Sequence, residues 1–128
     1  MTATARRRAP KFDVYQADCP TRLVLDRIAD KWTVLVLLLL QRQPWRFNEL
    51  RREVEGVSPK MLSHTLKSME RDGLIARKAH ATVPVTVEYS ILPLGRTLAA
   101  QMDSLRTWAE THVPEVLRAQ ARYDRTPA

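Results

Sequence analysis

One stretch of the sequence, Ser58–Gly73, constrains the fold most because both of its ends carry helix signals. The Ser58 side chain can accept a hydrogen bond from a first-turn N–H that has no partner within the helix. Pro59 suits the first helical position because it has no N–H to leave unpaired. Gly73 can adopt the left-handed conformation that ends a helix. The stretch is therefore predicted to form one complete helix.

The predicted helix has an apolar face and a polar face. Apolar residues recur at helical spacing on the inner face, namely Met61, Leu62, Leu66 and Met69. The outer face carries Lys60, Ser63, His64, Lys67 and Arg71, and no carboxylate precedes Glu70. Cations and short hydrogen-bonding side chains are what a helix in a DNA major groove requires. The alternative is an ordinary solvated face, because runs of charge usually face water.

A shorter helix is predicted immediately upstream. Asn48 is a suitable N-cap for a helix that ends at Val54, and Phe47 stands where it can pack onto the core. Gly56-Val57 then leads directly into Ser58. Two short helices separated by a tight turn, the second cationic on its outside, are the helix-turn-helix pattern.

After Gly73 the period of the pattern changes from helical to extended. Leu74–His80 is a strand candidate, and Val83–Ile91 alternates apolar and polar residues strictly. The link around Ala81-Thr82 lacks glycine, which predicts a loop of several residues instead of a two-residue turn. A β-hairpin behind such a helix is the wing of a winged helix. Its positive or polar groups are Arg77, Lys78 and His80.

Two helices are predicted before the helix-turn-helix. Cys19-Pro20-Thr21 opens the first, whose stripe of Leu23, Val24, Ile28 and Ala29 ends near Asp30. The second begins at Lys31-Trp32, and its Val34–Leu40 run is apolar on every side. A helix without a polar face is expected at the centre of the core. Gln41–Arg46, which contains Pro44, is predicted to form a turn.

The longest predicted helix runs from Pro93 to about His112. Its apolar stripe comprises Leu94, Leu98, Met102, Leu105, Ala109 and His112, extended by Trp108 and Val113. Pro114 is expected to kink or end it, leaving Glu115–Tyr123 as a further short helix. So long a stripe at the end of a small domain favours an intersubunit helix, and the alternative is packing on its own core. The predicted dimer contacts are Phe12, Tyr15, Leu98, Met102, Leu105, Trp108 and His112.

Length and charge bound the kind of protein. The 128 residues suit a single domain, and the net charge of +7 favours a polyanionic partner, of which nucleic acid is the commonest. Residues 1–11 hold part of this charge and form either a flexible basic arm or a solubilising tail. The predicted organisation is a domain over 12–123, with the helix-turn-helix at 48–73, the wing at 74–91, the C-terminal helix at 93–113, and a tail at 124–128.

The sequence shows no signal for secretion, membrane insertion or catalysis. The longest apolar run is far shorter than the roughly 20 residues that cross a bilayer, and a lone cysteine cannot form an internal disulfide. A cytoplasmic protein is therefore expected. His64, His80 and His112 lie on separate elements, and no metal-binding, nucleotide-binding or nucleophile motif is present. We expect no enzyme activity, no metal and no cofactor.

These features together resemble the HxlR-type family of winged helix-turn-helix regulators, which are related in fold to MarR-like proteins. The resemblance covers roughly Cys19–His112. It is carried by Cys19-Pro20, Asp30-Lys31-Trp32, Arg46-Phe47-Asn48-Glu49-Leu50, Ser58-Pro59-Lys60-Met61-Leu62, Glu70-Arg71-Asp72-Gly73-Leu74, Val87-Glu88-Tyr89-Ser90 and Leu94-Gly95. It implies a mainly α fold with a small β-hairpin, dimerised by terminal helices. It also implies a homodimer that binds a palindromic operator in double-stranded DNA and regulates transcription.

Carried over residue by residue, the resemblance implies base contacts from Lys60, Ser63, His64 and Lys67, phosphate contact from Arg46, and wing contacts around Lys78 to Thr82. The predicted DNA-binding set is Arg46, Ser58, Lys60, Ser63, His64, Lys67, Lys78, His80 and Thr82. The sequence departs from the family at Thr86, where arginine is common, and at Leu92, where Thr or Ser usually caps the last helix. The first departure puts a strong wing-tip contact in doubt.

Two alternatives stay open from the sequence. Some relatives sense oxidants or electrophiles through a cysteine at the position of Cys19, and a helix N-terminus stabilises thiolate. The other reading of Cys19 is a small buried residue near the dimer contact. The second alternative concerns the whole domain, because a winged helix can serve as a protein-protein interaction module without specific DNA binding. Such a module should carry apolar residues on the outer face. No effector can be identified from the sequence.

Overall fold

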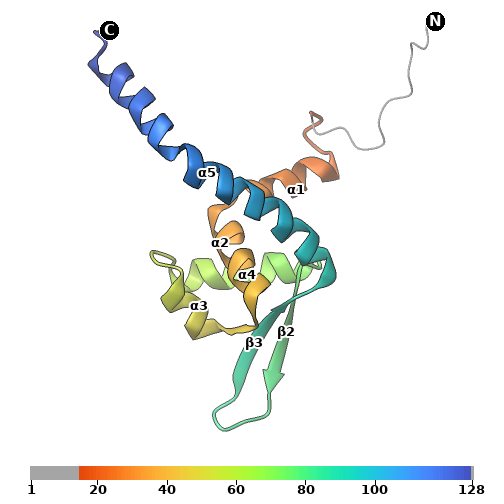
Figure 1. Cartoon of the computed structure of the whole chain (residues 1–128). Coiled ribbons are helices and arrows are strands. Elements are labelled where there is room, and N and C mark those ends of the chain that lie inside the picture. The colour runs from red at the N-terminus through yellow and green to blue at the C-terminus, as the bar shows by residue number, and fades with distance from the viewer. Residues whose placement is uncertain (1–14, 128) are drawn as a thin grey trace, which may run out of the picture.

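The computed structural model describes residues 15–127, so the predicted contact at Phe12 and the tail at 1–11 lie outside it. The helices are α1 (Pro20–Ala29), α2 (Lys31–Arg42), α3 (Phe47–Glu53), α4 (Pro59–Arg71) and α5 (Pro93–Arg125). The strands are β1 (Trp45–Arg46), β2 (Ile75–His80) and β3 (Thr86–Ile91). Figure 1 shows the hairpin β2–β3 and the C-terminal half of α5 extending from the helical body in opposite directions. The fold is a winged helix-turn-helix, mainly α with a small antiparallel sheet, as predicted.

The core is built around α2. Val36, Leu37 and Leu40 are at most 1% exposed and pack with apolar residues of α4 and α5. This confirms the prediction that the apolar run forms a central helix. Leu35 is the exception, since 43% of it is exposed.

A third strand, β1, was not predicted from the sequence. Trp45 and Arg46 pair with Tyr89 and Glu88 of β3, giving the strand order β1-β3-β2. The Trp45 indole Nε1 donates a hydrogen bond of 2.9 Å to the carbonyl of Leu39, which lies in the last turn of α2. The turn is shorter than the predicted Gln41–Arg46, because α2 continues to Arg42 and β1 begins at Trp45.

The hairpin has the expected long tip but a shorter second strand than predicted. Residues 81–85 connect β2 to β3, which confirms the loop of several residues. The expected strand character at Val83 and Val85 is wrong, since their exposed fractions are 102% and 68%. Pro84 between them has no N–H to contribute to a strand ladder, and the Thr82 hydroxyl donates a hydrogen bond of 2.7 Å to its carbonyl.

Helix α3 begins two residues earlier than an Asn48 cap would allow. Its first residue is Phe47, and the Glu49 carboxylate accepts a hydrogen bond of 2.8 Å from the Arg46 N–H. The N-cap position is therefore Arg46, and Asn48 is an exposed residue of the first turn. The carboxylate of the third helical residue thus satisfies the N–H of the N-cap residue.

Helix α5 does not end at Pro114, so the predicted separate short helix over Glu115–Tyr123 is wrong. It runs for 33 residues to Arg125 with Pro114 inside it. Proline removes one backbone donor, and the carbonyl of Glu110 that loses its partner lies in an exposed part of the helix, where water can replace the bond. Near its start, α5 packs tightly on the chain, because a Cβ at Gly95 would collide with the Leu74 carbonyl oxygen.

Helix α1 has no buried residue. The rest of the chain does not bury the predicted apolar stripe of α1, since Leu23 and Val24 are 49% and 51% exposed. Its link to the domain includes the ion pair between Arg27 Nε and Asp72 Oδ2, which are 2.7 Å apart. The apolar side of α1 is thus available to another surface.

Candidate nucleic-acid interface

The turn between α3 and α4 is held by residues on both sides of it. Val54 at the end of α3 and Val57 just before α4 are 4% and 8% exposed. Gly56 between them has a φ of 93°, a conformation that glycine adopts without strain. The two helices are therefore fixed relative to each other by apolar packing.

Helix α4 is complete at both ends, as predicted. The Ser58 hydroxyl accepts a hydrogen bond of 3.0 Å from the Met61 N–H, with Pro59 in the first turn. At the other end Gly73 has a φ of 78°, and the Leu74 N–H donates to the Met69 carbonyl at 3.0 Å. This is a left-handed C-terminal cap.

The inner face of α4 is anchored in the core. Leu62, Leu66 and Met69 are at most 1% exposed, as predicted. Met61 does not belong with them, because 42% of it is exposed. Thr65 takes the remaining inner position at 2% exposed, since residues 62, 65, 66 and 69 share one side of the helix.

The outer face of α4 presents the predicted base-contacting residues together. Lys60, His64 and Lys67 are exposed, and Ser63 is half-buried beside them. None of the cations in this set forms an ion pair within residues 15–127. The C-terminal end of the helix is held by the Arg27–Asp72 ion pair from α1. A rigid helix thus carries an uncompensated positive face.

The remaining predicted DNA contacts lie on the sheet and its loop. Arg46 is exposed on β1, and Lys78 is exposed on β2 at the position paired with Glu88. His80 Nε2 lies 3.4 Å from Glu88 Oε1, so its ring already faces a carboxylate. The Thr82 hydroxyl donates within the loop, so the wing offers Lys78 as its most available cation from the predicted set.

Two further cations of the helix-turn-helix were not in the predicted set. Arg51 and Arg52 are exposed in the last turn of α3. Helical periodicity places both away from the face of the buried Leu50, so the sequence pattern contains the signal that would have included them.

The predicted dimer residues on α5 divide into two groups. Met102 is fully buried in the core of its own chain and Leu98 packs partly against that core, so Met102 is not available to a partner. Leu105 and Trp108 are 56% and 57% exposed, and the Trp108 ring stacks on His112 with centroids 4.8 Å apart. Beyond Met102 the stripe is exposed, and Figure 1 shows the C-terminal half of α5 extending away from the helical body.

Cys19 occupies the N-cap position of α1 and is 8% exposed. Its carbonyl accepts a hydrogen bond of 3.0 Å from the Arg22 N–H, so the residue opens the helix as predicted. Tyr15, a predicted dimer contact nearby, is 88% exposed.

Within residues 15–127 no group of three or more His, Cys, Asp or Glu side chains is arranged to hold a metal ion. In the same part of the chain, no helix has both the length and the apolar character needed to cross a membrane.

Known proteins with similar sequences and structures are transcriptional regulators. The family model described as HxlR-like helix-turn-helix matches residues 27–116. The HTH-type transcriptional regulator YtfH of Escherichia coli K12 is 41% identical over 105 residues, covering 82% of this chain and 83% of that protein. YdeP of Bacillus subtilis 168, also named an HTH-type transcriptional regulator, is 35% identical over 80% of both chains.

Solved structures agree in fold and family. A transcriptional regulator, ytfH, from Salmonella typhimurium superposes with a TM-score of 0.82 at 37% identity, covering 87% of this chain and 99% of the other. The redox regulator HypR in its oxidized form has a TM-score of 0.68 at 34% identity, covering 73% and 96%. With a capped recognition helix, a hairpin wing and a family match over most of its length, the chain belongs to the HxlR family of helix-turn-helix transcriptional regulators.

Proposed function

We propose that the protein acts in the cytoplasm as a homodimer that binds a specific palindromic operator in double-stranded DNA. The observation that carries this proposal is the outer face of α4, where Lys60, His64 and Lys67 are exposed on a helix held at both ends. Such a face can contact base edges in the major groove, while Arg46 and Lys78 contact phosphates on either side. Arg51 and Arg52 add positive charge to the same motif.

The experiment is a fluorescence-anisotropy titration of the purified protein against its own upstream intergenic DNA and a scrambled duplex of equal length. We expect tighter binding to the native sequence and an affinity that falls linearly with the logarithm of salt concentration. Arg46→Ala should weaken binding to both duplexes alike and reduce the salt slope by about one unit per subunit, because a phosphate contact carries no sequence information. Equal weak binding to both duplexes by the parent protein would contradict specific operator recognition.

The dimer in this proposal forms through α1 and the second half of α5. The supporting observation is apolar surface that the chain leaves uncovered, comprising Leu23, Val24, Leu105, Trp108, Val113 and Leu117, each 47–57% exposed. Large apolar side chains left exposed in this number favour a protein interface.

Light scattering coupled to size exclusion tests the dimer. The parent should elute at about twice the 14.7 kDa chain mass, and a Leu105→Glu/Trp108→Glu variant at the chain mass, because charges are costly to bury in an apolar interface. Val85→Glu, which changes an exposed residue of the wing loop, is the control and should stay dimeric. A parent that is monomeric at micromolar concentration would refute the dimer.

Oxidant sensing through Cys19 is a second candidate activity. It is favoured by the similarity to structures of HypR and of diamide-treated YodB from Bacillus subtilis, the latter with a TM-score of 0.62 at 27% identity. The position at a helix N-terminus favours the thiolate, whereas an exposed fraction of 8% favours a packing role. Because the chain has one cysteine, a disulfide would join two molecules, with diamide accepting the two electrons and two protons of the two thiols.

Mass spectrometry after mild diamide treatment separates the two roles. A sensing Cys19 should appear in a disulfide-linked dimer, with DNA affinity changed by the oxidant and unchanged in Cys19→Ser. A Cys19 that stays reduced, with the same DNA affinity before and after treatment, would end the sensor hypothesis.

A winged helix that contacts only proteins is the competing function. The exposed Met61 is one apolar residue on the outer face of α4, but its neighbours there are Lys60, His64 and Lys67. These polar and cationic neighbours favour DNA over an apolar protein surface as the binding partner of α4.

A further inference from the structure

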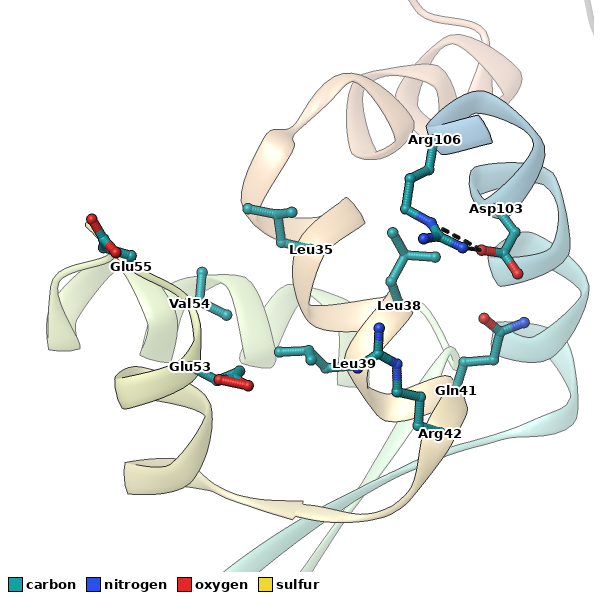
Figure 2. Close-up of a pocket in the computed structure, with 10 residues that line it drawn as sticks. All are labelled: Leu35, Leu38, Leu39, Gln41, Arg42, Glu53, Val54, Glu55, Asp103 and Arg106. Atoms are coloured by element: carbon teal, nitrogen blue, oxygen red, sulfur yellow. Dashed lines mark hydrogen bonds and ion pairs between the residues drawn. The ribbon is translucent and has the colours of Figure 1, made fainter. Parts of the chain in front are cut away.

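A pocket of about 620 Å³ opens between α2, the end of α3 and α5. Figure 2 shows its apolar part, formed by leucines of α2 and by Val54. Leu35 is 43% exposed here, although the adjacent Val36 and Leu37 are fully buried. Small-molecule sites in proteins have volumes of about 300–1,000 Å³ and mainly apolar walls. The pocket therefore has the size and the apolar surface to bury the body of a small organic molecule.

The two charged residues that α5 contributes to the pocket lining, Arg106 and Asp103, neutralise each other. Arg106 donates a hydrogen bond of 2.6 Å to Asp103, shown as a dashed line in Figure 2, and lies 3.7 Å from Glu110. The hydrogen bond to Asp103 and the negative charges of Asp103 and Glu110 raise the pKa of Arg106 above its ordinary value. The Arg106 guanidinium therefore forms its ion pairs with carboxylates of its own helix.

The charges on the other sides are not neutralised. Glu53 at the end of α3, Glu55 in the turn that follows and Arg42 at the end of α2 all line the pocket. Within residues 15–127 none of these three forms an ion pair. With Asp103 and Arg106 the lining carries three carboxylates and two guanidinium groups, a net charge of minus one on a chain with a net charge of +7.

We propose that this pocket binds an amphipathic organic cation, that is, a molecule with an apolar body and a single ammonium, phosphonium or similar onium group. The body would cover Leu35 and its neighbours, and the positive charge would lie toward Glu53 and Glu55. Removal of apolar surface from water supplies affinity, and the local negative potential selects the sign of the charge.

The pocket adjoins the helix-turn-helix, which makes its occupant a candidate effector. Val54 is the C-cap of α3, with its N–H bonded to the Leu50 carbonyl at 2.9 Å. Glu55 immediately precedes Gly56, whose φ of 93° forms the turn into α4. A ligand held there contacts both the segment that orients α4 and helix α5. This regulatory role rests on the proposed DNA-binding function, whereas ligand binding itself does not.

Calorimetric titration of the purified full chain with tetraphenylphosphonium, without DNA, tests the site. Saturable binding with one site per chain is expected. Glu53→Gln/Glu55→Gln should weaken it by about fivefold or more, and Arg42→Gln should strengthen it by about twofold or more, because the two changes alter the local charge in opposite directions. Leu35→Gln should also weaken binding, since it removes apolar surface from a partly exposed position that tolerates substitution.

Two controls separate the pocket from general charge effects. Glu115→Gln removes an exposed carboxylate of α5 that does not line the pocket, and should leave the affinity unchanged. Tetraphenylborate carries the same four phenyl groups with a negative charge, and Glu53→Gln/Glu55→Gln should not weaken its binding. Equal tetraphenylphosphonium affinity in the parent and this double variant would overturn the inference.

Absence of saturable binding would overturn it as well, and a second copy of the chain seated over the pocket would produce that result. Operator binding is measured separately by anisotropy, so a protein that fails to recognise its upstream DNA still gives an interpretable calorimetric result. Conversely, a failed calorimetric test leaves the operator titration unaffected.

Discussion

Replacing Leu66 by alanine is expected to lower the free energy of unfolding by about 2–5 kcal/mol. Leu66 is 1% exposed and lies on the inner face of α4, in the core cluster with residues of α2 and α5. The substitution removes buried apolar surface and leaves a cavity that the packed neighbours fill only partly. Urea unfolding followed by circular dichroism, at one fixed protein concentration, measures the change.

Val85→Ala is the control for this measurement. Val85 is 68% exposed in the wing loop, so its truncation should change the free energy of unfolding by less than about 0.5 kcal/mol. If Leu66→Ala were no more destabilising than Val85→Ala, the packing of α4 on the core described above would be wrong.

Removing both lysines of the outer face is expected to abolish recognition of the operator. Lys60→Ala and Lys67→Ala should each cost about 1–3 kcal/mol of binding free energy if the side chain contacts a base. The two positions lie about 10 Å apart along the helix axis, so the losses in the double variant should add. The preference for native over scrambled DNA should fall together with the affinity, and the anisotropy titration reports both.

A charge-matched variant distinguishes base contact from general attraction. Arg118→Ala/Arg122→Ala removes two positive charges from exposed positions near the end of α5. It should reduce affinity slightly and equally for both duplexes, because it changes only the long-range field. A loss of the same size in both double variants would show that Lys60 and Lys67 act through net charge alone.

The main elements could be predicted because their signals are local. Ser58, Pro59 and Gly73 specify the ends of α4 through bonds within one helical turn of each residue. The alternation that ends at Ile91 likewise predicts β3, because neighbouring side chains on a strand point to opposite faces. The outer face of α4 follows from the same periodicity, which correctly predicts that Lys60, His64 and Lys67 are exposed.

The errors arose where local patterns competed with context. Val83 and Val85 continue the alternation of β3, but they extend beyond the part of the hairpin that has an apolar surface to cover. Pro114 is a helix breaker in a buried helix, yet α5 passes through it where water can solvate the freed carbonyl. Met102 has the correct spacing for the α5 stripe, but the stripe divides into a buried half and an exposed half.

The sequence by itself determined the helix-turn-helix, the wing and the cationic face of α4, since caps and periodicity depend on residues a few positions apart. Only the tertiary structure decided that Trp45 donates to the last turn of α2, and that Arg27 joins Asp72 across 45 positions of the chain. The pocket between α2, α3 and α5 was likewise decided only by the tertiary structure. Each of these contacts depends on the docking of elements that are distant in sequence, and such docking is set by the packing of the whole core, which no short pattern encodes.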